Sequence, residues 1–365
     1  MDEVQKLHRT QGMQRMSEFL LKNANPSIVY RVKKEILQDI SEEEEDKLQK
    51  LILSEKLVQS ILECQKENGW LGNGFHGSNK NAGQFTNMEA GVKYLAEKGV
   101  NRETEVLKRA MIALKELPSN HPYYRGAWNV GDEFKYAANG GNLFRCACIA
   151  RGGYEDYIDI SPQIQLALDS FHRVLEVDSI LDVTYLVKRG TRRVFRDFEK
   201  WPCRYHLDIL AHTNGWRSEE NSRMLAQAVH KLMRTDCPEL VGVKADSWVG
   251  HVLATCGCFP SQGFSLVEDV DGISYYHLEY LIWLARCGVV LYIPTLREIT
   301  EKIWNSVNEE GVCDIAVHHS LFKDWGTYAG LQLEVDWKSK VRRNCDITFR
   351  ALQLCYYAGE WDNER

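Results

Sequence analysis

Leu143-Phe-Arg-Cys-Ala-Cys-Ile-Ala150 and Leu278-Glu-Tyr-Leu-Ile-Trp-Leu-Ala285 are nearly all apolar or small over about two helical turns each. Helices with almost no polar face are buried on all sides. Each stretch precedes a second predicted helix, and Glu219 to Met233 shows the character of such partners, with apolar residues at helical spacing and charges on the other side. The sequence therefore predicts buried helices that alternate with half-exposed ones.

This alternation recurs along the chain. Predicted buried helices start near residues 86, 142, 204, 274 and 345, at intervals of 56 to 71 residues. We expect an all-α fold of about five to six helix pairs that close into an α/α toroid, although an open solenoid gives the same alternation. The expected organisation is one domain over residues 1–365, with residues 1–40 as a helical extension packed on it.

Composition narrows the functional classes. The 365 residues are 44% hydrophobic and 26% charged, and the net charge of −6 argues against a nucleic-acid partner. The apolar stretch from Tyr280 to Pro294 contains Arg286 and is shorter than the roughly 20 residues of a membrane span, so no integral membrane segment is expected. Eleven cysteines and a polar N-terminus without a secretory signal predict free thiols in a cytoplasmic protein.

Several short motifs carry a resemblance to a known superfamily. Gln65-Lys-Glu-Asn-Gly-Trp70, at the end of a predicted helix, resembles the glutamine–tryptophan repeat of terpene cyclases and protein prenyltransferases, which staples successive helix pairs. Further matches are Asn25 to Arg31, Trp201-Pro202 with Tyr205 and Asp208, and Arg342 to Leu352. Together they look like the bacterial squalene-cyclase-like branch over nearly the whole chain. The resemblance implies a toroid with a pocket at the inner-helix mouths.

The resemblance also implies a catalytic acid. Proton-initiated cyclases of this superfamily carry an Asp-x-Asp-Asp motif at an inner-helix start, and its middle aspartate protonates the substrate. Here Asp269-Val-Asp271-Gly272 precedes the helix near 274, with glycine in the last position. Asp271 therefore takes the acid's place, while a turn built by Asp271 and Gly272 is the alternative interpretation. Asp208, near another inner-helix start, is the second candidate for the acid.

Polar residues near the other inner-helix starts complete the predicted site. His76, in a glycine-rich loop, is a candidate general acid or base. Each of the pairs Arg204 with Asp208 and Arg342 with Asp346 has a spacing of four residues, which predicts an ion pair on one helix face or a contact with a ligand. The predicted ligand-binding residues are Glu89, Asn142, Arg204, Tyr205, Trp337, Arg342 and Asp346.

These residues favour a small-molecule enzyme of the terpene-cyclase-like toroid type, an isomerase or lyase that cyclises an isoprenoid after protonation. One alternative is a lyase or hydrolase that acts on a glycan or glycoside through His76 and a tyrosine or carboxylate. Another is a toroid that binds a small ligand without catalysis. No cofactor and no metal is expected, because Cys146-Ala-Cys148 and Cys256-Gly-Cys258 are too closely spaced for ordinary paired zinc ligands.

Overall fold

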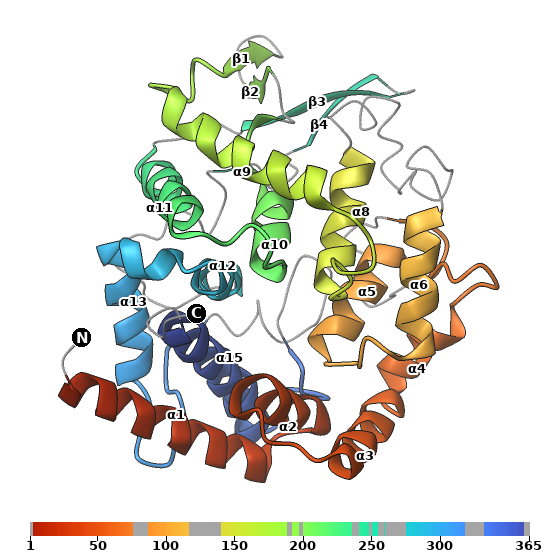
Figure 1. Ribbon diagram of the computed structural model, residues 1–365, viewed down its shortest axis with the longest axis vertical. Helices are drawn as coiled ribbons and strands as arrows, with labels where there is room; N and C mark the ends of the chain where they lie inside the picture. Colours follow the sequence, from red (N-terminus) through yellow and green to blue (C-terminus); the bar gives the residue numbers. More distant parts are fainter. Residues whose placement is uncertain are drawn as a thin grey trace. The chain divides into compact units, whose positions relative to one another are not determined.

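The computed structural model describes residues 3–75, 87–116, 140–187, 192–196, 200–235, 241–247, 250–254, 259, 275–317 and 332–360 (Figure 1). This part of the chain is mostly helical, which confirms the predicted helical class. Contacts divide the chain into two compact units. Unit 1 comprises residues 1–63, 94–101 and 267–365, and unit 2 comprises residues 64–93 and 102–266. Closure of the helix pairs into one toroidal domain stays a prediction.

Unit 1 is built around α15 (Lys340–Glu360), against which both α1 (Glu3–Asn23) and α12 (Tyr275–Arg286) pack (Figure 1). The helix α15 begins five residues before the predicted start at 345. Buried apolar side chains such as Leu20 and Phe349 fill its core. The other helices are α2 (Pro26–Arg31), the π-helix η1 (Val32–Leu37), α3 (Glu42–Leu53), α4 (Lys56–Glu63), the 3-10 helix η5 (Val289–Tyr292) and α13 (Pro294–Asn305).

Local sequence explains how two of these helices begin. The side chain of Asn25 accepts a hydrogen bond from the backbone N–H of Ile28, and Pro26 occupies the first turn of α2. Ser41 caps α3 by accepting from the N–H of Glu44 at 3.3 Å. The acidic run that follows Ser41 lies in the first turn, where carboxylates interact favourably with the helix dipole. Ser41 and the acidic run therefore fix the start of α3.

Unit 2 contains most of α5 (Met88–Glu97), followed by α6 (Glu105–Glu116), α8 (Gly140–Arg151), α9 (Ser161–Glu176), α10 (Arg204–His212) and α11 (Glu219–Met233). It also contains a four-stranded sheet in the order β1 (Thr184–Val187), β2 (Arg192–Phe195), β3 (Val241–Ser247) and β4 (Gly250–Ala254). The strand β2 pairs in parallel with β3, and the other pairs are antiparallel. A strand of four residues such as β2 is too short to show a clear alternation in the sequence.

The motif around Gln65 fastens its loop to the start of α6. The Gln65 Nε2 atom donates to the carbonyl oxygens of Gly69 and Val106, at 3.0 and 2.8 Å. Gly69 has φ +85°, and a Cβ atom there would lie 2.2 Å from the carbonyl oxygen of Arg109, so only glycine fits. Trp70 is fully buried and its Nε1 donates to the Gly74 carbonyl. These contacts give Gln65 and Trp70 a structural role in holding the loop.

We expect the substitution Gln65→Ala to lower the free energy of unfolding by about 1–2 kcal/mol, because two carbonyl oxygens lose their donor. Urea unfolding measures the change. The matched control is Gln165→Ala, since Gln165 bonds only to Asp169 on the exposed face of α9, and it should change stability by less than about 0.5 kcal/mol. Equal losses in the two variants would contradict the stapling role.

Two further expectations concern cysteines and membranes. Eight cysteines lie in the described part of the chain, all are free, and seven of them are buried. This agrees with the predicted free thiols. Across the described ranges, no helix combines the length and the apolar character needed to cross a membrane.

Candidate functional site

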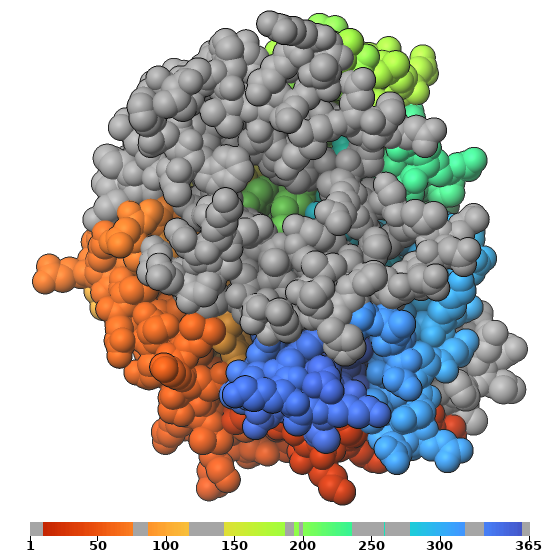
Figure 2. All heavy atoms as spheres, turned by 180° about the vertical axis from the view of Figure 1, so that it is seen from behind, coloured from red at the N-terminus to blue at the C-terminus, as the bar shows by residue number. Residues whose placement is uncertain are grey.

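The starts of three predicted inner helices meet in unit 2. Tyr205, the second residue of α10, donates its hydroxyl to Glu89 Oε1 at 2.7 Å, and Glu89 is the second residue of α5. The Tyr205 ring packs on Phe144 of α8, with 4.1 Å between ring centroids. The helices α5, α8 and α10 therefore begin at the same end of unit 2. Atoms in the green of α10 are visible in Figure 2.

One turn further along α10, Asp208 is held in an ion pair. Its Oδ2 lies 2.8 Å from Arg151 Nε of α8, and its Oδ1 lies 2.9 Å from His212 Nδ1. Burial raises the pKa of Asp208, but the charge of Arg151 and the hydrogen bond with His212 outweigh it and bring the pKa down to about 2. Asp208 is thus a carboxylate at neutral pH. This state argues against Asp208 as the proton donor.

Together these side chains form a stripe that we call the polar seam. Its members recur at helical spacing on the facing sides of α5, α8 and α10, and all are largely buried. They are Glu89, Lys93, Cys148, Arg151, Tyr205, Asp208 and His212. Burial of charged groups costs free energy unless they are paired. The ion pair of Asp208 with Arg151 offsets this cost within the polar seam. The sequence predicted Glu89, Tyr205 and Asp208 here, but not Lys93, Arg151 or His212.

In unit 1 the structure brings the predicted residues Trp337 and Asp346 together. The Asp346 carboxylate accepts hydrogen bonds from the N–H of Leu333 at 2.7 Å, the N–H of Glu334 at 3.2 Å and Trp337 Nε1 at 2.5 Å. The predicted pair of Arg342 with Asp346 is wrong. Arg342 pairs with Asp336 at 2.6 Å, because the donors of the loop before α15 already occupy the buried Asp346 oxygens.

Glu334, beside Asp346, was missed by the sequence reasoning. Its side chain is 5% exposed, and its Oε1 accepts from the backbone N–H of Asn25 at 2.9 Å. Burial, helped by the charge of Asp346, raises the pKa of Glu334 to about 7. Glu334 stands in the run Gln332-Leu-Glu-Val-Asp336, in which polar and apolar residues alternate. No signal in the sequence marks it as buried.

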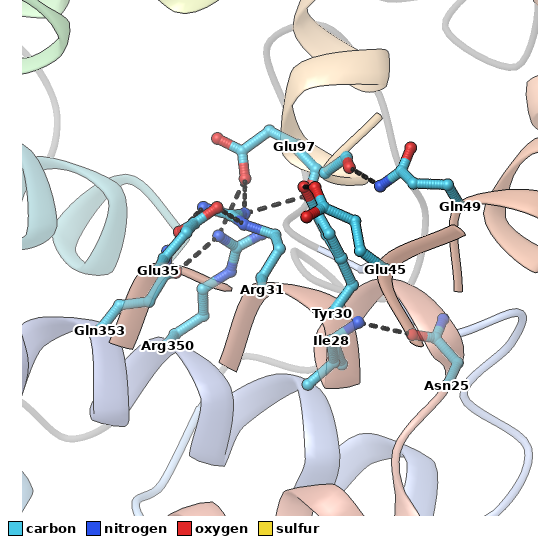
Figure 3. Close-up of polar contacts among 11 residues, drawn as sticks. Asn25, Ile28, Tyr30, Arg31, Glu35, Glu45, Gln49, Glu97, Arg350 and Gln353 are labelled. Atoms are coloured by element: carbon cyan, nitrogen blue, oxygen red, sulfur yellow. Dashed lines mark hydrogen bonds and ion pairs between the residues drawn. The ribbon is translucent and has the colours of Figure 1, made fainter. Parts of the chain in front are cut away.

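A second buried charge cluster in unit 1 involves Arg31, which ends one of the motifs that carry the resemblance. Glu97 Oε2 lies 3.2 Å from Arg31 Nη1 and 2.9 Å from Arg350 Nη1, so one carboxylate bridges two guanidinium groups (Figure 3). Glu35 also pairs with Arg31, at 2.7 Å. Both guanidinium groups lie within 5.5 Å of the Phe349 ring centroid. These contacts tie α2 and the end of α5 to α15 and indicate a structural role.

The remaining predicted site residues lie elsewhere. Asn142 accepts a hydrogen bond from Arg145 of its own helix at 2.9 Å, and Arg204 is buried at the start of α10. His76 and Asp271 lie outside the described residues. In the ranges that the structure describes, no group of three or more His, Cys, Asp or Glu side chains could hold a metal ion.

Comparisons with known proteins do not identify a relative. No protein-family model matches the chain, and neither the curated proteins nor the solved structures contain a significant match. The resemblance to the squalene-cyclase-like branch therefore stays an expectation from the sequence.

Proposed function

We propose that the chain is a small-molecule enzyme of the terpene-cyclase-like toroid type, with its pocket at the inner-helix mouths and an isoprenoid cyclised after protonation as its reaction. The hydrogen bond between Tyr205 and Glu89 carries this proposal, because it sets two predicted inner helices side by side with their starts at one end. A toroid needs this arrangement, in which each inner helix begins at the same mouth. Closure of the helix pairs into one toroid is part of the proposal.

Within this proposal, Asp271 is the acid and Asp208 orients its neighbours. The Asp208 carboxylate carries no proton to donate at neutral pH, since Arg151 and His212 hold it in the charged form. Glu89, Asn142, Arg204 and Tyr205 are the proposed ligand contacts from unit 2. Trp337, Arg342 and Asp346, which lie in unit 1, stay ligand-binding predictions from the sequence.

A second candidate function is a lyase or hydrolase that acts on a glycan or glycoside. The same Tyr205–Glu89 pair favours it, because a phenol hydrogen-bonded to a carboxylate can move a proton to or from a hydroxylated substrate. In that case Glu89 and Tyr205 would perform the acid–base chemistry, together with His76.

Turnover by matched variants separates the two candidates. Native mass spectrometry of the purified protein would identify any bound ligand, and the wild type would be assayed with linear isoprenoid alkenes, their epoxides and oligosaccharides. The cyclase proposal expects isoprenoid turnover that Asp271→Asn abolishes, whereas Asp182→Asn, on an exposed turn, leaves it unchanged. Oligosaccharide cleavage lost in Glu89→Gln would establish the second candidate. Isoprenoid turnover unchanged in Asp271→Asn would rule out proton donation by that residue.

A further inference from the structure

The segment that leads into α15 in unit 1 presents apolar and basic side chains together at the surface. Val335 is 61% exposed, more than any other large apolar side chain in the described ranges, and Val341 is 47% exposed. Lys338 and Lys340, which stand between the two valines in the sequence, are also exposed. Atoms in the blue of this segment are visible in Figure 2. A single exposed apolar residue is ordinary, but two of them among basic residues in one short segment mark an interaction surface.

Hydrogen bonds fix the backbone of this segment. The Asp336 carboxylate accepts from the backbone N–H of Lys338 at 2.8 Å and pairs with Arg342 Nη1 at 2.6 Å. Arg343 Nη1 donates to the carbonyl oxygen of Trp337 at 2.6 Å. The loop before α15 and the first turn of the helix are therefore tied together. A surface that is already ordered loses little conformational entropy when it binds a partner.

The positive charge of this segment is not balanced by the described part of the chain. Asp336 is engaged by Arg342. None of the described carboxylates forms an ion pair with Lys338, Lys340 or Arg343. The first turn of α15 contains no acid. Because the N-terminal end of a helix carries a partial positive charge, basic residues there do not stabilise the helix. Their position favours an anionic partner over a purely structural role.

The two valines decide between the classes of anionic partner. At the surface of a bilayer, a valine side chain enters the boundary of the hydrocarbon, while the long side chain of a lysine reaches the lipid phosphates. A single-stranded nucleic acid would instead need aromatic faces on which its bases stack. The aromatic ring of this segment, Trp337, is 9% exposed and donates its Nε1 to Asp346. A lipid surface therefore matches the exposed side chains better than a nucleic acid does.

We propose that Val335, Lys338, Lys340, Val341 and Arg343 form a docking surface for a membrane that contains anionic phospholipids. The chain then lies at the bilayer surface and binds it reversibly. Each basic residue near an anionic bilayer strengthens binding by about fivefold at moderate salt. The valines add a smaller contribution that does not depend on salt. This inference does not rest on the proposed function, because it requires no particular reaction.

Flotation of the full-length chain with lipid vesicles tests the surface. Vesicles of phosphatidylcholine with about 30% phosphatidylglycerol are compared with vesicles of phosphatidylcholine alone. We expect about tenfold stronger binding to the anionic vesicles at about 0.1 M NaCl, and a loss of most of this difference at about 0.5 M NaCl, where exposed charges are screened. The double variant Lys338→Gln with Lys340→Gln should bind the anionic vesicles about tenfold more weakly. The variant Val335→Ser with Val341→Ser should bind about threefold more weakly at both salt concentrations.

Matched controls remove the same groups elsewhere in unit 1. Lys50→Gln with Lys56→Gln deletes two exposed positive charges, and Leu51→Ser deletes an apolar side chain that is 44% exposed on α3. Both should change binding by less than about twofold, because they lie outside the docking surface. Circular dichroism and the urea midpoint of each variant verify that it is folded.

Several results would overturn the proposal. They are equal binding to the two kinds of vesicle, no binding to either, or an equal loss in the lysine variant and its control. Fluorescence anisotropy with a labelled single-stranded oligonucleotide provides the remaining comparison. Oligonucleotide binding that Lys338→Gln with Lys340→Gln abolishes would assign the surface to a nucleic acid instead. None of these measurements depends on the turnover that tests the proposed function.

Discussion

The substitution Glu97→Gln is expected to lower the free energy of unfolding by about 3 to 5 kcal/mol, because it removes the carboxylate that bridges Arg31 and Arg350. Both guanidinium groups are at most 5% exposed, so neither can regain full hydration when the bridge is lost. In the variant, Arg31 keeps Glu35 and Arg350 keeps its hydrogen bond to Gln353. Urea unfolding followed by circular dichroism measures the loss.

The matched control for Glu97 is Glu219→Gln. Glu219 pairs with Arg223 at 2.5 Å, but both side chains are more than 60% exposed. Its loss should be below about 1 kcal/mol, as for other surface ion pairs. The double variant Glu97→Gln with Arg350→Met should be more stable than Glu97→Gln alone, because the uncompensated charge is gone. Similar losses in the two single variants would show that the cluster of Figure 3 contributes no more than a surface pair.

The substitution Asp208→Asn is expected to cost about 3 to 5 kcal/mol, since it leaves Arg151 buried without its carboxylate. The pKa of Asp208 is lowered to about 2, so the carboxylate stabilises the folded state at every pH above about 4 and loses this effect only as the pH falls toward 2. The part of the loss that comes from Arg151 should therefore be the same at pH 6 and at pH 8, whereas the contact with His212 adds to it only where His212 is protonated. Thermal or urea unfolding at the two pH values measures it.

The control is Asp156→Asn, which removes a pair with Arg102 at 3.1 Å whose side chains are 54% and 41% exposed. This variant should lose less than about 1 kcal/mol. An Asp208→Asn variant as stable as the wild type would contradict the ion pair as a stabilising element. It would also support a protonated Asp208 that acts directly as the catalytic acid.

The helices could be predicted from the sequence because their signal is local. The periodicity of Glu219 to Met233 placed α11 at its observed bounds, and the capped acidic run after Ser41 placed the start of α3. Glu89 and Tyr205 were predicted for one site because each lies at the start of an inner helix, and the structure joins them. The short strands left no such local signal.

The pairing of charges could not be predicted, because it depends on how helices pack. A spacing of four residues suggested Arg342 for Asp346, but the donors come from the loop of Leu333 to Trp337. Arg151 reaches Asp208 from another helix, at a separation of 57 residues. The burial of Glu334 could not be predicted, because the residue that contacts its side chain, Asn25, lies 309 residues earlier in the sequence. Such contacts follow from the three-dimensional arrangement and leave no pattern in one sequence.

The division of the chain into two units has a consequence for the order of folding. Unit 2 spans residues 64–266 except for residues 94–101, whereas unit 1 combines residues 1–63 and 94–101 with residues 267–365. During synthesis the chain emerges from its N-terminus, so unit 2 can gather its helices while unit 1 still lacks α12 and α15. Until α15 is made, α1 and α2 lack the helix against which they pack. Their buried side chains, such as Leu20 and Ile28, therefore stay exposed in the nascent chain for longer than those of unit 2.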